Sequence, residues 1–318
     1  MADRVAILLL AHGTPDALDE IPEYLRNITG GRPMPESVVE EIRHRYSLIG
    51  ISPLTRLTLQ QGALLSEQLG LPVYVGMRNW KPYIADVIRQ MREDGVAKFV
   101  AICLAPQNSR TSVGLYRRAV MAESAGMCVE FVEGWADHPK LSEAFAERLC
   151  AVLRPFEAEA GHRVHVLFTA HSVPCRTIQT QSPAQTEAQP KDAAALVPDP
   201  YAVEAKRTAA NVAECAGVAE EDWYFAFQSQ GMSGGPWIGP TVEDTLTALH
   251  QEGAREIVID PIGFLCDHVE ILYDIDIAFR DFAKKLGMKV RRPESLNDSP
   301  LLKAALADIA RQGLTRLG

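Results

Sequence analysis

The chain has 318 residues, of which 47% are hydrophobic and 23% charged, and this length and composition allow two globular domains with full cores. Its formal net charge of -9 disfavours nucleic acid as a partner, because a phosphate backbone repels an acidic surface. The sequence has no apolar run long enough to span a membrane, and its first residues lack the features of a secretory signal. We therefore expect a cytoplasmic protein without a membrane span.

Strand-like and helix-like segments alternate along the chain. The run from Arg4 to Leu10 is continuously apolar, as expected of a strand buried on both faces in a parallel sheet. The same criteria predict further strands at 72–76, 98–104, 128–132, 163–169, 223–227 and 255–260. Helices are predicted between them, beginning with those near 16–28, 36–48, 53–69, 82–93 and 112–125. Such alternation indicates parallel sheets with right-handed crossovers.

Residues 178–198 interrupt this alternation. The segment is polar, punctuated by proline and poor in aromatic residues, so it cannot bury enough apolar surface to form a packed core. We predict an exposed, mobile insertion there.

The two halves of the chain resemble each other. An apolar strand ends in Ala-His followed by a small residue twice, once at His12 and once at His171. We therefore predict an α/β fold with two similar Rossmann-like domains, each a parallel sheet flanked by helices, and a ligand cleft between them. Ligands in open parallel sheets bind outside the carboxyl ends of the strands, so both histidines should face that cleft.

Acidic residues follow the last predicted strand. A helix is expected from Asp267 to about Ala283, and helical spacing would place Asp267, Glu270 and Asp274 on one face. Such a row is either a solvated face near a helix N-terminus or a track for cations. With the imidazole of His171, the carboxylates would suit a divalent transition metal such as ferrous iron, or act as bases for N–H protons.

Other motifs narrow the choice of chemistry. The chain contains no dinucleotide-binding G-x-G-x-x-G after a strand, no P-loop and no G-x-S-x-G elbow. Its six cysteines form no C-x-x-C pair, so we expect reduced thiols, no iron–sulfur cluster and no other tightly bound cofactor. Apolar residues that either line the cleft or pack in the cores are Ile51, Leu54, Trp80, Tyr83, Trp237 and Phe264.

At these residues the sequence resembles the ferrochelatases, most closely the short bacterial type that inserts iron into coproporphyrin III. The resemblance covers nearly the whole chain, and the Ala-His-Ser-Val-Pro and Asp-His-x-Glu-x-Leu-Tyr-Asp-x-Asp pair is its most specific part. The Gln-Ser-x-Gly motif at 228–231, followed by Pro-Trp at 236–237, is similar to the form found in the coproporphyrin branch of the family and not to that of the protoporphyrin branch. The matching segments are 11–15, 45–54, 75–78, 104–106, 169–174, 199–201, 228–237 and 264–276.

The resemblance implies a two-domain chelatase fold. Residues 1–106 and 296–318 would form the first domain, with a C-terminal helix returning to it, and 107–295 the second. It also implies ferrous iron and a porphyrin as substrates, in a monomeric protein of haem biosynthesis.

The resemblance further implies roles for individual residues. His171 and Glu270 match the family's metal-handling and proton-abstracting pair, and Asp274 matches the next acid along the helix. Thr14, Arg45, Tyr46 and Ser52 match positions that hold propionates. Tyr116 is expected to have a similar role, and Arg32 and Arg78 are weaker candidates. His12 would face the ring from the side opposite His171.

Several positions depart from the family pattern. His12 stands where relatives often have Tyr or Asn, and Asn79 stands where a close relative has His. Thr29 occupies a position where Arg is usual, and Ala278 replaces the third acidic residue of the acidic helix. The alternatives left open are a protoporphyrin IX ferrochelatase, a cobalt or nickel chelatase of the same fold, and a porphyrin or haem carrier without turnover.

Overall fold

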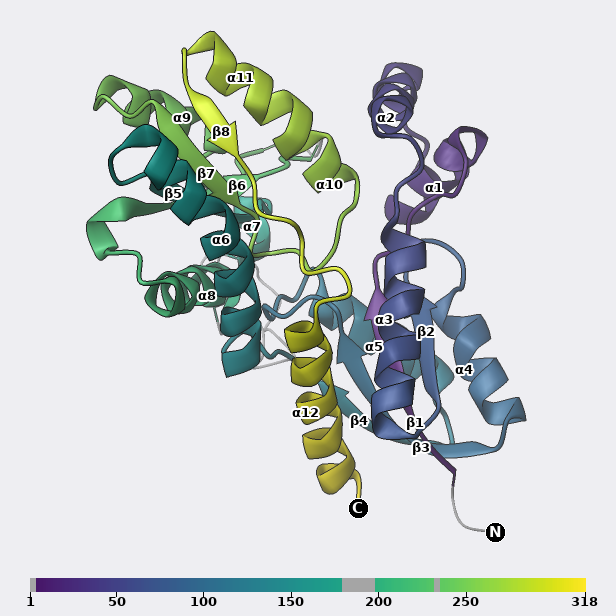
Figure 1. The fold of residues 1–318 in the computed structure, drawn as a ribbon. Helices are drawn as coiled ribbons and strands as arrows, with labels where there is room; N and C mark the ends of the chain where they lie inside the picture. Colours follow the sequence, from purple (N-terminus) through teal and green to yellow (C-terminus); the bar gives the residue numbers. More distant parts are fainter. Residues whose placement is uncertain (1–3, 179–197, 232–234) are drawn as a thin grey trace, which may run out of the picture.

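The computed structural model describes residues 4–178, 198–231 and 235–318. Its strands form two parallel four-stranded sheets, with orders β2-β1-β3-β4 and β6-β5-β7-β8 (Figure 1). The strands are β1 (Arg4–Ala11), β2 (Val73–Met77), β3 (Val96–Cys103), β4 (Cys128–Val132), β5 (His165–His171), β6 (Trp223–Gln228), β7 (Glu256–Asp260) and β8 (Lys289–Arg291). The predicted fold class is therefore confirmed, and the two halves share one strand order. The insertion predicted at 178–198 lies, apart from its end residues, outside the described residues.

Helices cover both faces of each sheet. The α-helices are α1 (Ile21–Ile28), α2 (Glu36–Ile49), α3 (Leu54–Leu69), α4 (Ile84–Glu93), α5 (Val113–Glu123), α6 (Pro139–Ala160), α7 (Cys175–Ile178), α8 (Tyr201–Ala216), α9 (Val242–Gln251), α10 (Val269–Leu272), α11 (Arg280–Lys285) and α12 (Pro300–Leu317). Short 3₁₀ turns lie at Leu18–Glu20 and Glu220–Asp222, and a π-helical segment, η5, at Asp274–Phe279. In the part of the chain that the structure describes, no helix is both long and apolar enough to cross a membrane.

The continuous apolar run of β1 is explained by burial on both faces. Its side chains alternate, so Leu8 packs toward the core shared with α4 and α5, and Leu9 toward the core shared with α3 and α12. The second core also contains Phe168 of β5 and residues of α6 and α8, so one apolar cluster spans both halves. This continuity holds the carboxyl ends of the two sheets in a defined relation.

The sheets do not divide the chain at the predicted domain boundary. Strand β4 lies inside the range 107–295 predicted for the second domain, yet it pairs with β3 in the first sheet. The first sheet thus extends beyond residue 106, because α5 is the crossover that returns the chain to it. The C-terminal helix α12 packs against β3 and β4 and also contacts α6, as Figure 1 shows.

The predicted helix from Asp267 differs most from expectation. Helical structure begins at Val269, and the segment η5 interrupts it. Asp267 precedes the helix: its side chain accepts hydrogen bonds from Ser295 (2.7 Å) and Asn297 (3.0 Å). The prediction of three acids on one face is therefore wrong for Asp267, because hydrogen bonds to the segment before α12 hold it away from Glu270.

Candidate active site

A cavity of about 340 Å³ lies where the carboxyl ends of both sheets face each other. Residues after β1 and β2 line one wall, and residues after β5 and β7 line the other. Sequence-predicted site residues on the lining are His12, Thr14, Tyr46, Arg78, Tyr116, His171 and Glu270. Those that the structure places outside the lining are Arg32, Arg45, Ser52 and Asp274.

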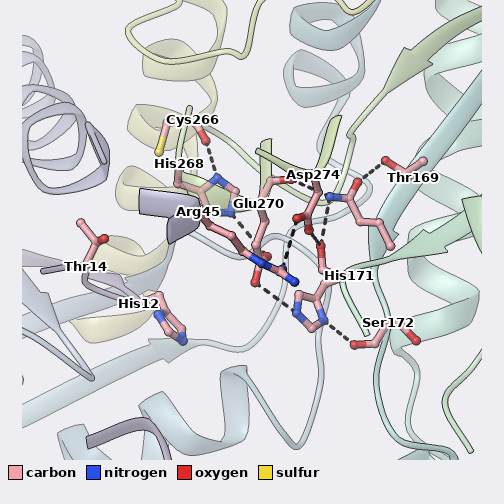
Figure 2. Close-up of polar contacts among 12 residues, drawn as sticks. His12, Thr14, Arg45, Thr169, His171, Ser172, Cys266, His268, Glu270 and Asp274 are labelled. Atoms are coloured by element: carbon pink, nitrogen blue, oxygen red, sulfur yellow. Dashed lines mark hydrogen bonds and ion pairs between the residues drawn. The ribbon is translucent and has the colours of Figure 1, made fainter. Parts of the chain in front are cut away.

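Glu270 is held between two histidines on the second wall (Figure 2). His171 Nε2 lies 3.3 Å from Glu270 Oε1, and His268 Nε2 lies 3.5 Å from Oε2. Each imidazole also directs Nδ1 to a backbone carbonyl, that of Ser172 for His171 and that of Cys266 for His268. A carbonyl oxygen only accepts, so Nδ1 carries a proton in both rings and Nε2 is the nitrogen available for chemistry.

The charges in this group are strongly coupled. Burial by itself would lower the pKa of His171, but the Glu270 carboxylate outweighs it and raises the pKa to about 9. Burial opposes ionisation of Glu270 as well, yet its histidine neighbours hold its pKa well below the usual range. At neutral pH the empty site therefore holds an imidazolium–carboxylate pair.

Backbone and side-chain contacts fix this pair in place. Gln228, the last residue of β6, donates from Nε2 to the carbonyl of Glu270 at 2.9 Å and accepts from Thr169 Oγ1 at 2.6 Å. Tyr201 Oη donates to the carbonyl of His171 at 2.8 Å. The Gln228 side chain thus joins the main chain of Glu270 to the Thr169 side chain of β5, and Tyr201 holds the main chain of His171. These contacts limit the freedom of both reactive groups.

Asp274 lies behind the pair, away from the cavity lining. It accepts a hydrogen bond from Ser229 Oγ, and its Oδ1 is 3.7 Å from Arg45 Nη1 of helix α2. Burial raises the pKa of Asp274 to about 6, and the nearby Glu270 carboxylate adds to this rise. The group therefore changes charge close to physiological pH.

Asp274 should produce a measurable pH dependence of stability. Because its pKa is about 6 in the folded protein against 3.8 ordinarily, the folded state binds the proton more tightly, and stability falls as pH rises through this window. In Asp274→Asn this contribution should vanish, so the difference in unfolding free energy between wild type and variant should shrink from pH 3.8 to about 6. Urea unfolding across this range, with the exposed carboxylate variant Asp281→Asn as control, tests the expectation. An unchanged difference would contradict it.

The first wall carries a different histidine. His12 Nδ1 donates to the carbonyl of Gly13 at 3.1 Å, and its Nε2 accepts from Asn79 Nδ2 at 2.9 Å. Burial, with the positive charge of Arg78 as a second cause, lowers the pKa of His12 to about 4. This imidazole is neutral, in contrast to His171, although the two lie at the ends of equivalent strands, His12 just after β1 and His171 at the end of β5.

The candidate propionate-binding residues fall into two groups. Thr14 and Tyr46 line the cavity and hydrogen-bond to each other at 3.0 Å. Arg32 is exposed and its Nε donates to the Thr29 carbonyl at 3.1 Å, whereas Ser52 is buried beyond the lining. Arg45 donates to Glu41 at 2.9 Å, the helical pairing that spacing allows, in addition to facing Asp274.

Three of the six apolar residues considered for the cleft line the cavity: Leu54, Trp237 and Phe264. Trp80 is instead fully buried beside Tyr24, and Ile51 is 65% exposed. Tyr83 lies outside the lining, where its hydroxyl accepts from Asn27 at 3.0 Å. These three do not form the wall.

Sequence reasoning assigned no role to His268. Residues two apart on a helix do not face each other, so helical spacing gave no reason to pair it with Glu270. The structure places His268 before α10 in extended backbone, with φ -162° and ψ -176°, and this lets its ring reach the carboxylate. The start of the helix at Val269 was the missing information.

Comparison with solved structures supports the fold. The sirohydrochlorin chelatase SirB from Bacillus subtilis subspecies spizizenii matches with a TM-score of 0.54 and 10% identity, covering 98% of this chain and 95% of that one. CbiX, described as the terminal enzyme of sirohaem biosynthesis in denitrifying bacteria, matches with a TM-score of 0.52 and 14% identity over 96% and 98%. At such low identity these matches show the fold alone, which is that of the chelatases.

Comparison of sequences defines the family. The ferrochelatase family model matches residues 4–314, and the chain belongs to this family. A ferrochelatase of Acidobacterium capsulatum is 69% identical over 100% of this chain and 97% of its own length. A protein of Geobacillus kaustophilus named coproporphyrin III ferrochelatase is 32% identical over 95% of this chain and 94% of its own. The resemblance to ferrochelatases is thereby confirmed.

Proposed function

We propose that this protein inserts ferrous iron into a porphyrin ring in haem biosynthesis, with coproporphyrin III as the preferred ring. The observation that supports it most is Glu270 held between two histidines on one wall of a cavity whose opposite wall carries a neutral imidazole. The family supports the reaction, since both relatives described above are named as ferrochelatases. The name of the Geobacillus protein supports the choice of ring.

Insertion requires an iron ion on one face of the ring and the departure of two pyrrole protons. Glu270 presents a carboxylate that attracts the dication, and His171 presents Nε2 3.3 Å away. Approach of a second cation lowers the pKa of the imidazolium by repulsion and releases its Nε2 proton. The freed Nε2 lone pair and the carboxylate are then one nitrogen and one oxygen donor for iron, or bases for the pyrrole protons.

The proposed reaction exchanges one Fe²⁺ for two protons, so charge balances without electron transfer. A resident redox cofactor is not needed, and iron is a substrate. Among the described residues, no group of three or more His, Cys, Asp or Glu side chains could hold a metal ion. A site with few protein ligands suits delivery, because the ring must supply four nitrogens to the same ion.

Coproporphyrin III has four propionates, whereas protoporphyrin IX has two propionates and two vinyl groups. The cavity lining offers hydroxyl groups from Thr14, Tyr46 and Tyr116 and the guanidinium of Arg78. A vinyl group in place of a carboxylate leaves such donors unpaired, at about 1–3 kcal/mol for each buried one. This cost favours the tetracarboxylate ring.

Anaerobic turnover with each ring tests the proposal. We expect Fe²⁺ insertion, followed by absorbance and mass spectrometry, to be faster with coproporphyrin III than with protoporphyrin IX. Faster turnover with protoporphyrin IX would contradict the preferred ring and leave iron insertion standing. A spectral shift on binding without metal in the ring would indicate a carrier, and preference for Co²⁺ or Ni²⁺ with a sirohydrochlorin-like ring would indicate a different chelatase.

A further inference from the structure

We propose that Arg78 forms an inner carboxylate-binding subsite of the cavity and anchors one propionate of the porphyrin. The identity of the ligand rests on the proposed function, whereas the site itself rests on unpaired donors, local charge and position.

The guanidinium of Arg78 has donors without acceptors. Its Nε and Nη1 are buried and have no hydrogen-bond partner among the described residues. Other arginines near the cleft are paired: Arg45 contacts Glu41 and Asp274, and Arg292 forms two hydrogen bonds with Asp276. Arg78 as a whole is half-buried, but leaving these two buried N–H donors without an acceptor is unfavourable, so they point to an anion that would accept hydrogen bonds from them.

The position of Arg78 is fixed by the backbone. Its N–H donates to the Ala11 carbonyl at 3.0 Å, and the Asn79 N–H donates to the His12 carbonyl at 2.9 Å, so the pairing of β1 with β2 continues past both strands. The guanidinium lies 5.2 Å from the centre of the Tyr116 ring, a cation–π arrangement that orients its plane. The side chain is thus held at the cavity before any ligand binds, which lowers the ordering cost of binding.

The surroundings favour an anion of carboxylate type. Among the described residues no carboxylate forms an ion pair with Arg78, so no protein acid competes for its guanidinium. The neighbouring His12 is neutral and does not compete with Arg78 for an anion. The hydroxyl-bearing residues Thr111 and Ser112 line the same cavity. A guanidinium fork matches the two oxygens of a carboxylate, and propionates are the only anionic groups of the proposed substrate.

This inference reverses the order of the two arginines expected from sequence. Arg45 looked like the stronger propionate ligand and Arg78 the weaker. In the structure a propionate at Arg45 would have to displace Glu41 or Asp274, whereas at Arg78 it would satisfy donors that are otherwise unpaired.

Binding of metal-free porphyrin tests the subsite separately from iron insertion. Fluorescence titration should show that Arg78→Gln weakens binding of coproporphyrin III roughly 10- to 100-fold, the range of one charge-assisted hydrogen-bonded pair. Arg78→Lys should lose less, because it keeps the charge but not the fork. The tetramethyl ester of coproporphyrin III, measured in the same detergent, should bind wild type and Arg78→Gln within about twofold, because it offers no carboxylate.

Two controls separate binding from structure. Arg89→Gln removes the same charge from an exposed arginine of α4 that pairs with Asp86 and lies outside the cavity lining, and it should leave coproporphyrin III affinity within about twofold. The melting temperature of Arg78→Gln should stay close to that of wild type, because the two buried donors have no partner to lose and only the contact with the Tyr116 ring is removed. Unchanged affinity for coproporphyrin III, or equal losses for acid and ester, would overturn the subsite. Failure of wild type to insert iron would overturn the proposed function, while the binding comparison would still decide the subsite.

Discussion

Replacing His171 by alanine should lower the rate of iron insertion by about 10²- to 10⁴-fold, the usual contribution of a positioned acid or base. The variant loses the imidazole that ends β5 and lies 3.3 Å from Glu270 Oε1. Porphyrin affinity should change little, because apolar residues on the lining are untouched. Anaerobic turnover and fluorescence titration measure the two quantities in one preparation.

His162 supplies the matched control for this variant. It is a largely exposed histidine near the far end of the same half, and its side chain reaches Glu256 rather than the cavity. His162→Ala should retain wild-type turnover. Substantial iron insertion by a folded His171→Ala protein would contradict the assignment of His171.

Glu270→Gln should reduce turnover far more than porphyrin affinity. The amide keeps the shape of the side chain but has neither the charge that attracts iron nor the basicity that accepts a proton. Without the carboxylate, burial of His171 is largely unopposed, so its pKa should fall from about 9 toward or below 6.5. NMR titration of the imidazole gives the pKa directly, and equal losses in turnover and affinity would indicate a binding role instead.

The same variant has a stability consequence with a definite sign. A folded pKa of about 9 against 6.5 means that the charged pair stabilises the protein fully below pH 6.5 and loses this effect as pH rises through about 9. The stability gap between wild type and Glu270→Gln should therefore narrow over that interval. A gap that is constant from pH 6 to 10 would show that His171 is not protonated in the folded protein.

The sheets could be predicted from sequence because their central strands are continuously apolar. Leu8 and Leu9 face different cores, so both must be apolar. In the equivalent strand β5, Leu167 and Phe168 also face different cores, and both are apolar. Strand β8 was not predicted, because three residues give too little periodicity. The place of β4 could not be predicted either, since strand order depends on tertiary contacts that local patterns do not record.

The sequence predicted those site residues whose place at the end of a strand determines that their side chains face the cavity. His12 and His171 follow strand ends, and the structure places both on the cavity lining. Side-chain pairing was predictable only in part: helical spacing allows Arg45 to pair with Glu41, but it does not indicate the contact of Arg45 with Asp274 or the two donors of Arg78 that lack an acceptor. The π-helical segment and the start of α10 at Val269 likewise depend on packing. Because the helix starts there, the Asp267 side chain contacts Ser295, whereas the His268 side chain contacts Glu270.

Of the two histidines at equivalent strand ends, His171 is protonated and His12 is neutral, so the two walls of the cavity differ in charge. The wall of His171 carries the Glu270 carboxylate, whereas the wall of His12 carries the unpaired cation of Arg78. The Arg78 side therefore repels a dication inside the cavity, whereas the Glu270 side offers it a carboxylate. An internally repeated fold therefore presents unlike charges on the two sides of one cavity.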